Sequence, residues 1–315
     1  ESKPLKFVDP IYGPIDVSTY SESYSGTESL VDATLASDNT VYTQLALDIG
    51  PDRVAEMAKA MGIKTKLDGF PAETLGGLRI GVSPLEMASA YSTLAAGGLQ
   101  RDPVAIEKVL FPDGEEDLPG RGQANRVMSE AVAYEVTKIL NANITGGTGT
   151  GAYTGCSGQA GKTGTTDNFI DAWFVGYQPN LSTAAWVGYP ESNSISTGLS
   201  GGSTPASIWN SFYNNAAVPC ESFPVPDEAM IWGKFTGQYT VSKDKTSQYD
   251  ETIDETDAGN KNKKKPGDEA ADPNNPDAYN PGAGTQEPAG GGQAPAPPSG
   301  GGVTPPPATG GVTPG

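Results

Sequence analysis

Apolar residues recur at helical spacing in several stretches of the chain. Residues 39–49 carry their apolar positions on one face and end at Gly50-Pro51, a typical helix stop. Residues 51–61 begin with Pro and are followed by Gly62, which predicts a second helix and a helical hairpin. The same periodicity predicts helices over residues 27–35, 83–96, 129–142 and 204–217.

Two aromatic and β-branched runs, residues 171–177 and 182–189, flank the turn sequence Gln178-Pro179-Asn180-Leu181. This pattern predicts an antiparallel hairpin, and we expect the strand that contains Lys162 to lie beside it. Helices followed by antiparallel strands indicate an α+β fold in which helices flank an antiparallel sheet. In the last helix, Ile208, Trp209, Phe212 and Tyr213 are expected to form the buried stripe.

Composition changes sharply toward the C-terminus. Much of the Gly and Pro lies after residue 265, where apolar residues nearly vanish and burial cannot offset chain entropy. We therefore expect residues 1–232 to fold, residues 233–265 to form a charged linker, and residues 266–315 to be a disordered Gly/Pro-rich tail.

Charge and rare residues exclude several functions. The net charge of −18 disfavours nucleic acid as a partner, because an acidic surface repels phosphates. The chain has no histidine, so it holds no Ser-His-Asp triad or histidine-ligated metal, and no cofactor is expected. Its cysteines, Cys156 and Cys220, form either a disulfide or two unremarkable thiols. The polar start without Met or an apolar leader suggests a fragment or processed product.

The most informative stretch is Ala160-Gly161-Lys162-Thr163-Gly164-Thr165-Thr166, which allows two chemical interpretations. Gly-Lys-Thr ends a Walker A phosphate loop, but that motif needs Gly where Cys156 stands. It also requires a helix after the loop, and strand-like residues follow here. The nucleotide-binding interpretation is therefore disfavoured.

In the second interpretation, Lys-Thr-Gly lies on the edge of an active-site sheet and works with Ser-x-x-Lys and Ser-Asp-Asn in serine acyl transfer. Lys162 would attract a substrate carboxylate, and Thr163 and Thr165 would donate hydrogen bonds to it. Gly164 would allow close approach, and the Thr165 amide would supply half of an oxyanion hole.

A second motif, Ser37-Asp38-Asn39, lies directly before a predicted helix. Alone, the tripeptide is best explained as helix capping by Ser37 or Asn39. Its order relative to Lys162-Thr163-Gly164 makes a shared active site the stronger interpretation.

Beyond these motifs, the chain over about residues 17–215 resembles the transpeptidase half of bifunctional class A penicillin-binding proteins, particularly actinobacterial members. The resemblance rests on these segments in family order: Ser37-Asp38-Asn39-Thr40-Val41-Tyr42, Gly76-Gly77-Leu78, Gly81-Val82-Ser83-Pro84-Leu85-Glu86-Met87-Ala88, Gly147-Thr148-Gly149, Ala160-Gly161-Lys162-Thr163-Gly164-Thr165-Thr166 and Trp186-Val187-Gly188-Tyr189. It implies the fold that penicillin-binding proteins share with serine β-lactamases.

The resemblance also implies a mechanism and partners. A serine would attack the penultimate D-Ala carbonyl of a peptidoglycan stem peptide, release D-Ala and pass the acyl group to another stem's amine, and β-lactams would acylate the same serine. Ser37 would shuttle a proton, Asn39 would bind the substrate amide, and Lys162 would supply electrostatics. Thr163, Gly164, Thr165 and Thr166 would form the substrate-binding strand. The site would lie outside the cell membrane, with the parent protein anchored by an N-terminal segment.

The chain departs from the family in one respect. Ser-x-x-Lys should precede Ser37, and residues 1–36 contain no match. The match at Ser242 and Lys245 lies in the charged linker and is attributed to chance. We therefore expect that the nucleophile is not in this chain, that the upstream part of the same polypeptide completes the site, and that the chain alone is inactive.

Alternatives from other classes remain open. A class A β-lactamase would need Glu-x-x-Leu-Asn for deacylation, and that string is absent. A D,D-carboxypeptidase would carry the same motifs, since the choice of water over an amine depends on pocket shape. A non-catalytic cell-wall-binding module would explain the missing nucleophile.

Overall fold

The computed structural model describes residues 1–120, 122–192, 194–233 and 235–240. Within these residues no helix combines the length and the apolar character that crossing a bilayer requires. The predicted tail and most of the predicted linker lie outside the described residues.

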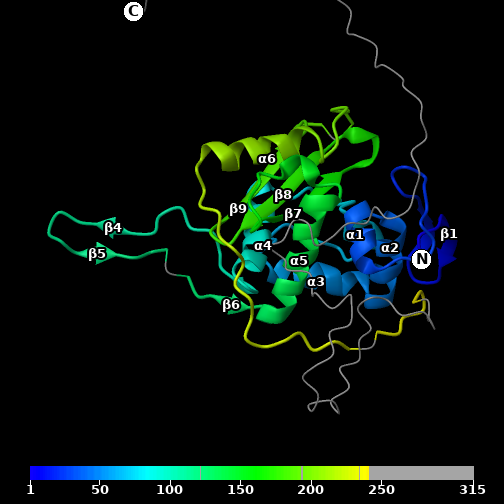
Figure 1. The fold of residues 1–315 in the computed structure, drawn as a ribbon, viewed down its shortest axis with the longest axis horizontal. Helices are drawn as coiled ribbons and strands as arrows, with labels where there is room; N and C mark the ends of the chain where they lie inside the picture. Colours follow the sequence, from blue (N-terminus) through cyan, green and yellow to red (C-terminus); the bar gives the residue numbers. More distant parts are fainter. Residues whose placement is uncertain (121, 193, 234, 241–315) are drawn as a thin grey trace, which may run out of the picture. The chain divides into compact units, whose positions relative to one another are not determined.

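All of the predicted helices are present (Figure 1). Their bounds are α1 Leu30–Ala36, α2 Asn39–Ile49, α3 Pro51–Ala60, α4 Pro84–Ala95, α5 Glu130–Gly146 and α6 Thr204–Asn215. Three short 3-10 helices accompany them: η1 Pro71–Leu75, η2 Thr150–Ala152 and η3 Asp167–Phe169.

Helix bounds differ from the prediction where capping or burial decides. The first helix begins at Leu30 instead of residue 27, because the Ser29 hydroxyl accepts a hydrogen bond from the Asp32 N–H and caps it there. Helix α5 continues to Gly146, four residues beyond the predicted end, and buries Ile144 completely. Burial in the core thus outweighs the weak helix propensity of its last turn.

The main sheet is antiparallel and has the order β7-β8-β9, with β7 Ala160–Thr165, β8 Ala172–Gln178 and β9 Leu181–Val187. The predicted place of the Lys162 strand beside the hairpin is confirmed, since Lys162 is paired with Val175. The turn between β8 and β9 is shorter than predicted. Gln178 and Leu181 still pair with each other, which leaves only Pro179 and Asn180 in the loop.

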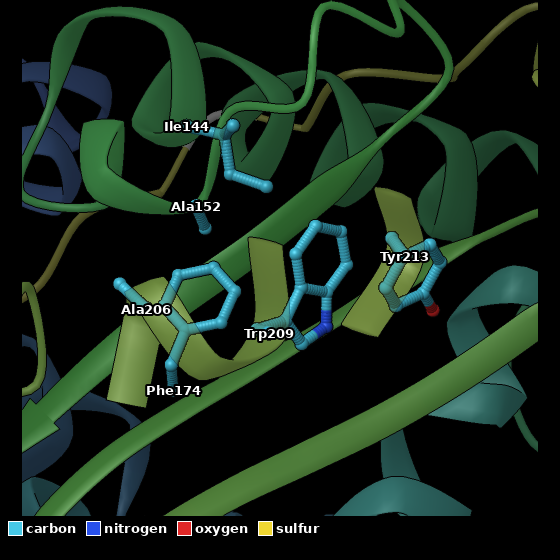
Figure 2. Close-up of a cluster of buried hydrophobic side chains, with 6 residues drawn as sticks. All are labelled: Ile144, Ala152, Phe174, Ala206, Trp209 and Tyr213. Carbon is cyan, nitrogen blue, oxygen red and sulfur yellow. The ribbon is translucent and has the colours of Figure 1, made fainter. Parts of the chain in front are cut away.

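Helices cover both faces of this sheet (Figure 1). Helices α4 and α5 pack on one face, where Leu94 and Leu140 contact the strand residues Ala160 and Tyr177. Helix α6 packs on the other face over Phe174 (Figure 2). Neighbouring residues of β7 therefore project toward different helices.

The packing of α6 corrects part of the predicted stripe. Trp209 and Tyr213 are buried in the cluster that α6 forms with Phe174 (Figure 2). Their rings stack with centroids 3.9 Å apart. Ile208 and Phe212 are instead 48% and 46% exposed. Expecting these two residues in the buried stripe was wrong, because the sheet covers only the side of α6 that carries Ala206, Trp209 and Tyr213.

Several short antiparallel strands were not predicted. Strands β1 Leu5–Asp9 and β2 Gly13–Val17 form a hairpin whose turn is held by the Asp9 carboxylate. Strand β3 Leu99–Gln100 pairs with β6 Asn125–Arg126, and β4 Val109–Leu110 pairs with β5 Glu116–Asp117. Strands of two residues are too short to show an alternating pattern.

Two long-range links tie the C-terminal part of the described chain to the rest. Cys156 and Cys220 form a disulfide that joins the segment before β7 to the segment after α6. Tyr239 lies within the predicted linker, yet its N–H donates to the Asp48 carboxylate of α2 at 3.1 Å. Its ring also lies 5.9 Å from that of Phe7.

Candidate active site

Ser37 lies at the end of α1 in a left-handed conformation, with φ 57° and ψ 47°. Its N–H donates to the Thr34 carbonyl at 3.1 Å and closes the helix. The Ser37 hydroxyl accepts a hydrogen bond from Lys162 Nζ at 2.9 Å. The two motifs found in the sequence therefore meet through this bond.

Asp38, and not Ser37 or Asn39, caps the following helix α2. Its carboxylate accepts the N–H groups of Thr40 and Val41 at 2.8 and 3.0 Å. Burial raises the pKa of Asp38, but hydrogen bonds from Ser2, Thr40 and Val41 outweigh that effect and keep the pKa below its usual value. Because Asp38 caps α2, the Ser37 hydroxyl is not needed for the cap and can bond to Lys162.

Asn39 occupies the first turn of α2. Its side-chain amide donates to the Ser18 carbonyl at 3.4 Å, in the loop that follows β2. This bond directs the Asn39 amide toward that loop. Its expected contact with substrate stays a prediction.

Lys162 carries its charge among neutral oxygens. Besides Ser37, Nζ donates to the carbonyl and the hydroxyl of Thr163 at 3.2 and 3.3 Å. Burial lowers the pKa of Lys162 to about 8. A partly buried cation whose hydrogen bonds within the described residues all go to neutral groups is favourably placed to bind an anionic ligand.

Strand β7 presents main-chain donors at its open edge. The Thr166 N–H donates to the Asp171 carbonyl at 3.1 Å, across the end of the pair between β7 and β8. Hydrogen-bonded pairs alternate along antiparallel strands, so the N–H groups of Thr163 and Thr165 are directed away from β8. The edge can therefore accept an extended ligand and offer it the Thr165 N–H.

A Cβ on Gly164 would lie 3.2 Å from the Cβ of Trp173 on β8, so the lack of a side chain here relieves a tight contact within the sheet. A Cβ on Gly201 would lie 2.6 Å from the Gly164 carbonyl oxygen and 2.2 Å from that of Trp173, so the loop before α6 presses on the strand. The Gly201 N–H also donates to the Thr165 hydroxyl at 2.9 Å, which leaves the hydroxyl proton of Thr165 available.

Thr166 belongs to the turn that follows β7. Its hydroxyl accepts a hydrogen bond from the Asp171 N–H at 2.8 Å. The predicted substrate contact of Thr166 stays a prediction, and these bonds assign the side chain to the turn.

The sequence interpretation missed Thr148 as a member of the site. Its hydroxyl lies 2.8 Å from that of Thr163, so it extends the hydrogen-bonded group formed by Ser37, Lys162 and Thr163. The signal was Gly147-Thr148-Gly149, which the sequence analysis used for the family resemblance without giving Thr148 a role in the site.

Comparison with known proteins agrees with this geometry. Residues 4–212 match the penicillin binding protein transpeptidase domain. The chain is 33% identical to penicillin-binding protein 1B of Escherichia coli over 231 residues, which cover 72% of the chain and 27% of that protein. It is 35% identical to penicillin-binding protein 1A of Mycolicibacterium smegmatis over 64% of the chain and 29% of that protein. The chain thus spans less than a third of the length of these relatives.

Solved structures show the same fold. The penicillin-binding protein PonA1 from Mycobacterium tuberculosis matches with a TM-score of 0.61 and 29% identity, over 78% of this chain and 69% of that one. Its complex with penicillin V matches with a TM-score of 0.59 and 30% identity, over 72% and 65% of the two chains. The site formed by Ser37 and Lys162, the sheet that holds it and these matches together show that the chain belongs to the penicillin-binding protein transpeptidase family.

Proposed function

We propose that the protein is a peptidoglycan D,D-transpeptidase and a target of β-lactams. The observation that carries the proposal is the 2.9 Å bond from Lys162 Nζ to the Ser37 hydroxyl, which joins Ser-Asp-Asn to Lys-Thr-Gly. This pairing places a cation and a proton-carrying hydroxyl side by side, as acyl transfer at a serine requires.

In this proposal the open edge of β7 binds the stem peptide. Lys162 attracts the terminal carboxylate, and the hydroxyls of Thr163 and Thr165 donate to it. The outward Thr165 N–H faces the oxyanion that develops on the attacked carbonyl. Ser37 passes a proton to the leaving D-Ala amine, and Asn39 binds the substrate amide.

The nucleophile is supplied by the upstream part of the same polypeptide. Residues 1–36 carry no Ser-x-x-Lys, so the serine that forms the ester and the lysine that takes its proton must come from elsewhere. The complete protein acts on the outer side of the cell membrane, where its substrate lies. A water acceptor in place of an amine would make the same site a D,D-carboxypeptidase.

Replacing Lys162 tests the proposal in the longer polypeptide that carries the upstream segment. We expect Lys162→Ala to slow acylation by benzylpenicillin at least ~100-fold, because a buried charge-assisted contact is lost. Lys138→Ala is the control, since Lys138 is half-buried on α5 and pairs there with Glu135 at 3.0 Å. An unchanged acylation rate in Lys162→Ala would remove the role assigned to this lysine.

A further inference from the structure

The turn at residues 147–149, between α5 and η2, is pressed against the end of α1. The N–H groups of Gly147 and Gly149 both donate to the Asn143 carbonyl, at 3.0 and 3.2 Å. A Cβ on Gly147 would lie 2.9 Å from the Leu35 carbonyl, and a Cβ on Gly149 would lie 2.7 Å from Asn143 Oδ1. Only glycine permits so close an approach, so the turn is built to hold Thr148 in one place.

Asn143 connects this turn to the segment that carries Ser37. Its side chain is fully buried, and Nδ2 donates to the Thr34 carbonyl at 3.4 Å and to the Thr148 hydroxyl at 3.3 Å. The Thr148 N–H adds a bond to the Leu35 carbonyl at 3.1 Å. One buried side chain thus contacts both the end of α1 and the residue that bonds to Thr163.

These contacts favour one direction for the hydrogen bonds. A carbonyl only accepts, so the Thr34 carbonyl requires the Asn143 NH₂ group on this side, and the Thr148 hydroxyl must accept from it. The Thr148 hydroxyl keeps its own proton, and the Thr163 hydroxyl, 2.8 Å away, is the acceptor that the described residues place within its reach, so we assign this bond as Thr148 donating to Thr163. Lys162 Nζ also donates to the Thr163 hydroxyl, at 3.3 Å. Both acceptor positions of Thr163 are therefore used, and its own proton is left for a ligand.

We propose that Asn143 and Thr148 are positioning residues that make the Thr163 hydroxyl a donor toward the ligand carboxylate. The proposal rests on the proposed function, because the ligand is the carboxylate-bearing substrate or β-lactam. It adds two residues that act through Thr163 without touching the ligand.

The test compares benzylpenicillin with its methyl ester, in which the carboxylate is masked. In the longer polypeptide, we expect Thr148→Val to lower the ratio of the two acylation rate constants about fivefold, since one oriented charge-assisted bond is weakened. Thr148→Ser keeps the hydroxyl and should restore the wild-type ratio. Thr145→Val is the matched control, because the Thr145 hydroxyl bonds only to carbonyls of its own helix among the described residues.

A second variant reverses the hydrogen bonds. In Asn143→Asp the carboxylate accepts the Thr148 proton, so Thr163 must donate to Thr148 and loses its proton for the ligand. We expect a larger fall in the ratio, measured per folded molecule. Where this variant does not fold, Thr148→Val decides.

The outcomes separate this inference from the proposed function. A wild-type protein that neither compound acylates overturns the proposed function and the inference with it. A wild type that is acylated, with an unchanged ratio in Thr148→Val, overturns the inference alone. A lowered ratio in Thr145→Val as well would show a general disturbance of the turn and would also overturn it.

Discussion

Lys162 is the residue whose burial most directly affects the chemistry of the site. Burial lowers its pKa to about 8 from an ordinary value of 10.5, so the unfolded chain holds the proton over a pH range in which the folded chain releases it. Below about pH 8 the folded state carries the buried Lys162 charge, and the cost of burying that charge reduces the free energy of unfolding. That cost disappears as the pH rises toward 10.5.

This shift predicts a pH dependence of stability. As the pH rises from about 8 to 10.5, the free energy of unfolding of the wild type should increase relative to that of Lys162→Met, which cannot titrate. Urea unfolding of both proteins across this range measures the difference. A constant difference would mean that the Lys162 pKa is not lowered by folding.

Acylation should follow the same proton in the opposite direction. We expect the acylation rate by benzylpenicillin in the longer polypeptide to fall as the pH rises through about 8, because the ammonium that attracts the carboxylate is lost. With the methyl ester, the fall should be smaller. Equal profiles for the two compounds would contradict a carboxylate-binding role of Lys162.

At the level of single residues, the sequence predicted only part of the site. Ser37 and Lys162 were found because each belongs to a short motif with its own chemistry. Asn143 and Thr148 were not, because their role depends on a contact between Asn143 and Thr34, which are 109 positions apart. Such a contact leaves no local pattern in a single sequence.

Among the elements, α4 shows how the start of a helix can organise a longer segment. Ser83 and Glu86 form a capping box, and the Glu86 carboxylate also accepts the N–H groups of Lys64 and Thr65 at 2.9 and 2.6 Å. Burial raises the pKa of Glu86, but hydrogen bonds from Ser83 and Thr65 outweigh burial and lower the pKa to about 2.

Replacing this carboxylate should destabilise the fold. We expect Glu86→Gln to reduce the free energy of unfolding by ~1–2 kcal/mol at pH 7, because charge-assisted hydrogen bonds are replaced by weaker neutral ones. The contribution is present above the ordinary pKa of 4.5 and is lost as the pH falls toward about 2, so the difference should shrink there. Glu130→Gln, which removes an exposed ion pair with Arg126 in the first turn of α5, is the control in urea unfolding. A difference that stays constant down to pH 2 would contradict this account.

Helices and strands were predicted well where a hydrophobic repeat continued over several turns or where a capping residue marked an end. Helix α2 has the predicted bounds, and Ser83-Pro84 marked the start of α4. The hairpin of β1 and β2 was missed because only Leu5 and Ile15 of its strands are buried, so no alternating stripe exists to detect. The extra turn of α5 was missed because only the folded core shows what Ile144 contacts.

For the whole molecule, the disulfide is the strongest single link. It closes a loop of 64 residues between Cys156 and Cys220. It also holds the segment after α6 against the segment before β7. The two segments are in close contact there, since a Cβ on Gly158 would overlap the Glu221 carbonyl. The sequence left this pairing open, because cysteine spacing alone does not give a distance.

Loss of the disulfide should lower stability substantially. We expect Cys156→Ser/Cys220→Ser to reduce the free energy of unfolding by about 4 kcal/mol, from the chain entropy released in the unfolded state. Thermal unfolding with and without reductant measures this. The wild type should respond to reductant and the double variant should not, and an equal response of the two would argue against the bond.

The central claim is that this chain supplies two of three active-site motifs and that the upstream segment supplies the nucleophile. Intact-mass spectrometry after incubation with benzylpenicillin, followed by peptide mapping, tests it most directly. The account predicts one stable adduct on the longer polypeptide, at a serine upstream of Ser37, and none on this chain alone. An adduct on this chain, or none on the longer polypeptide, would contradict it.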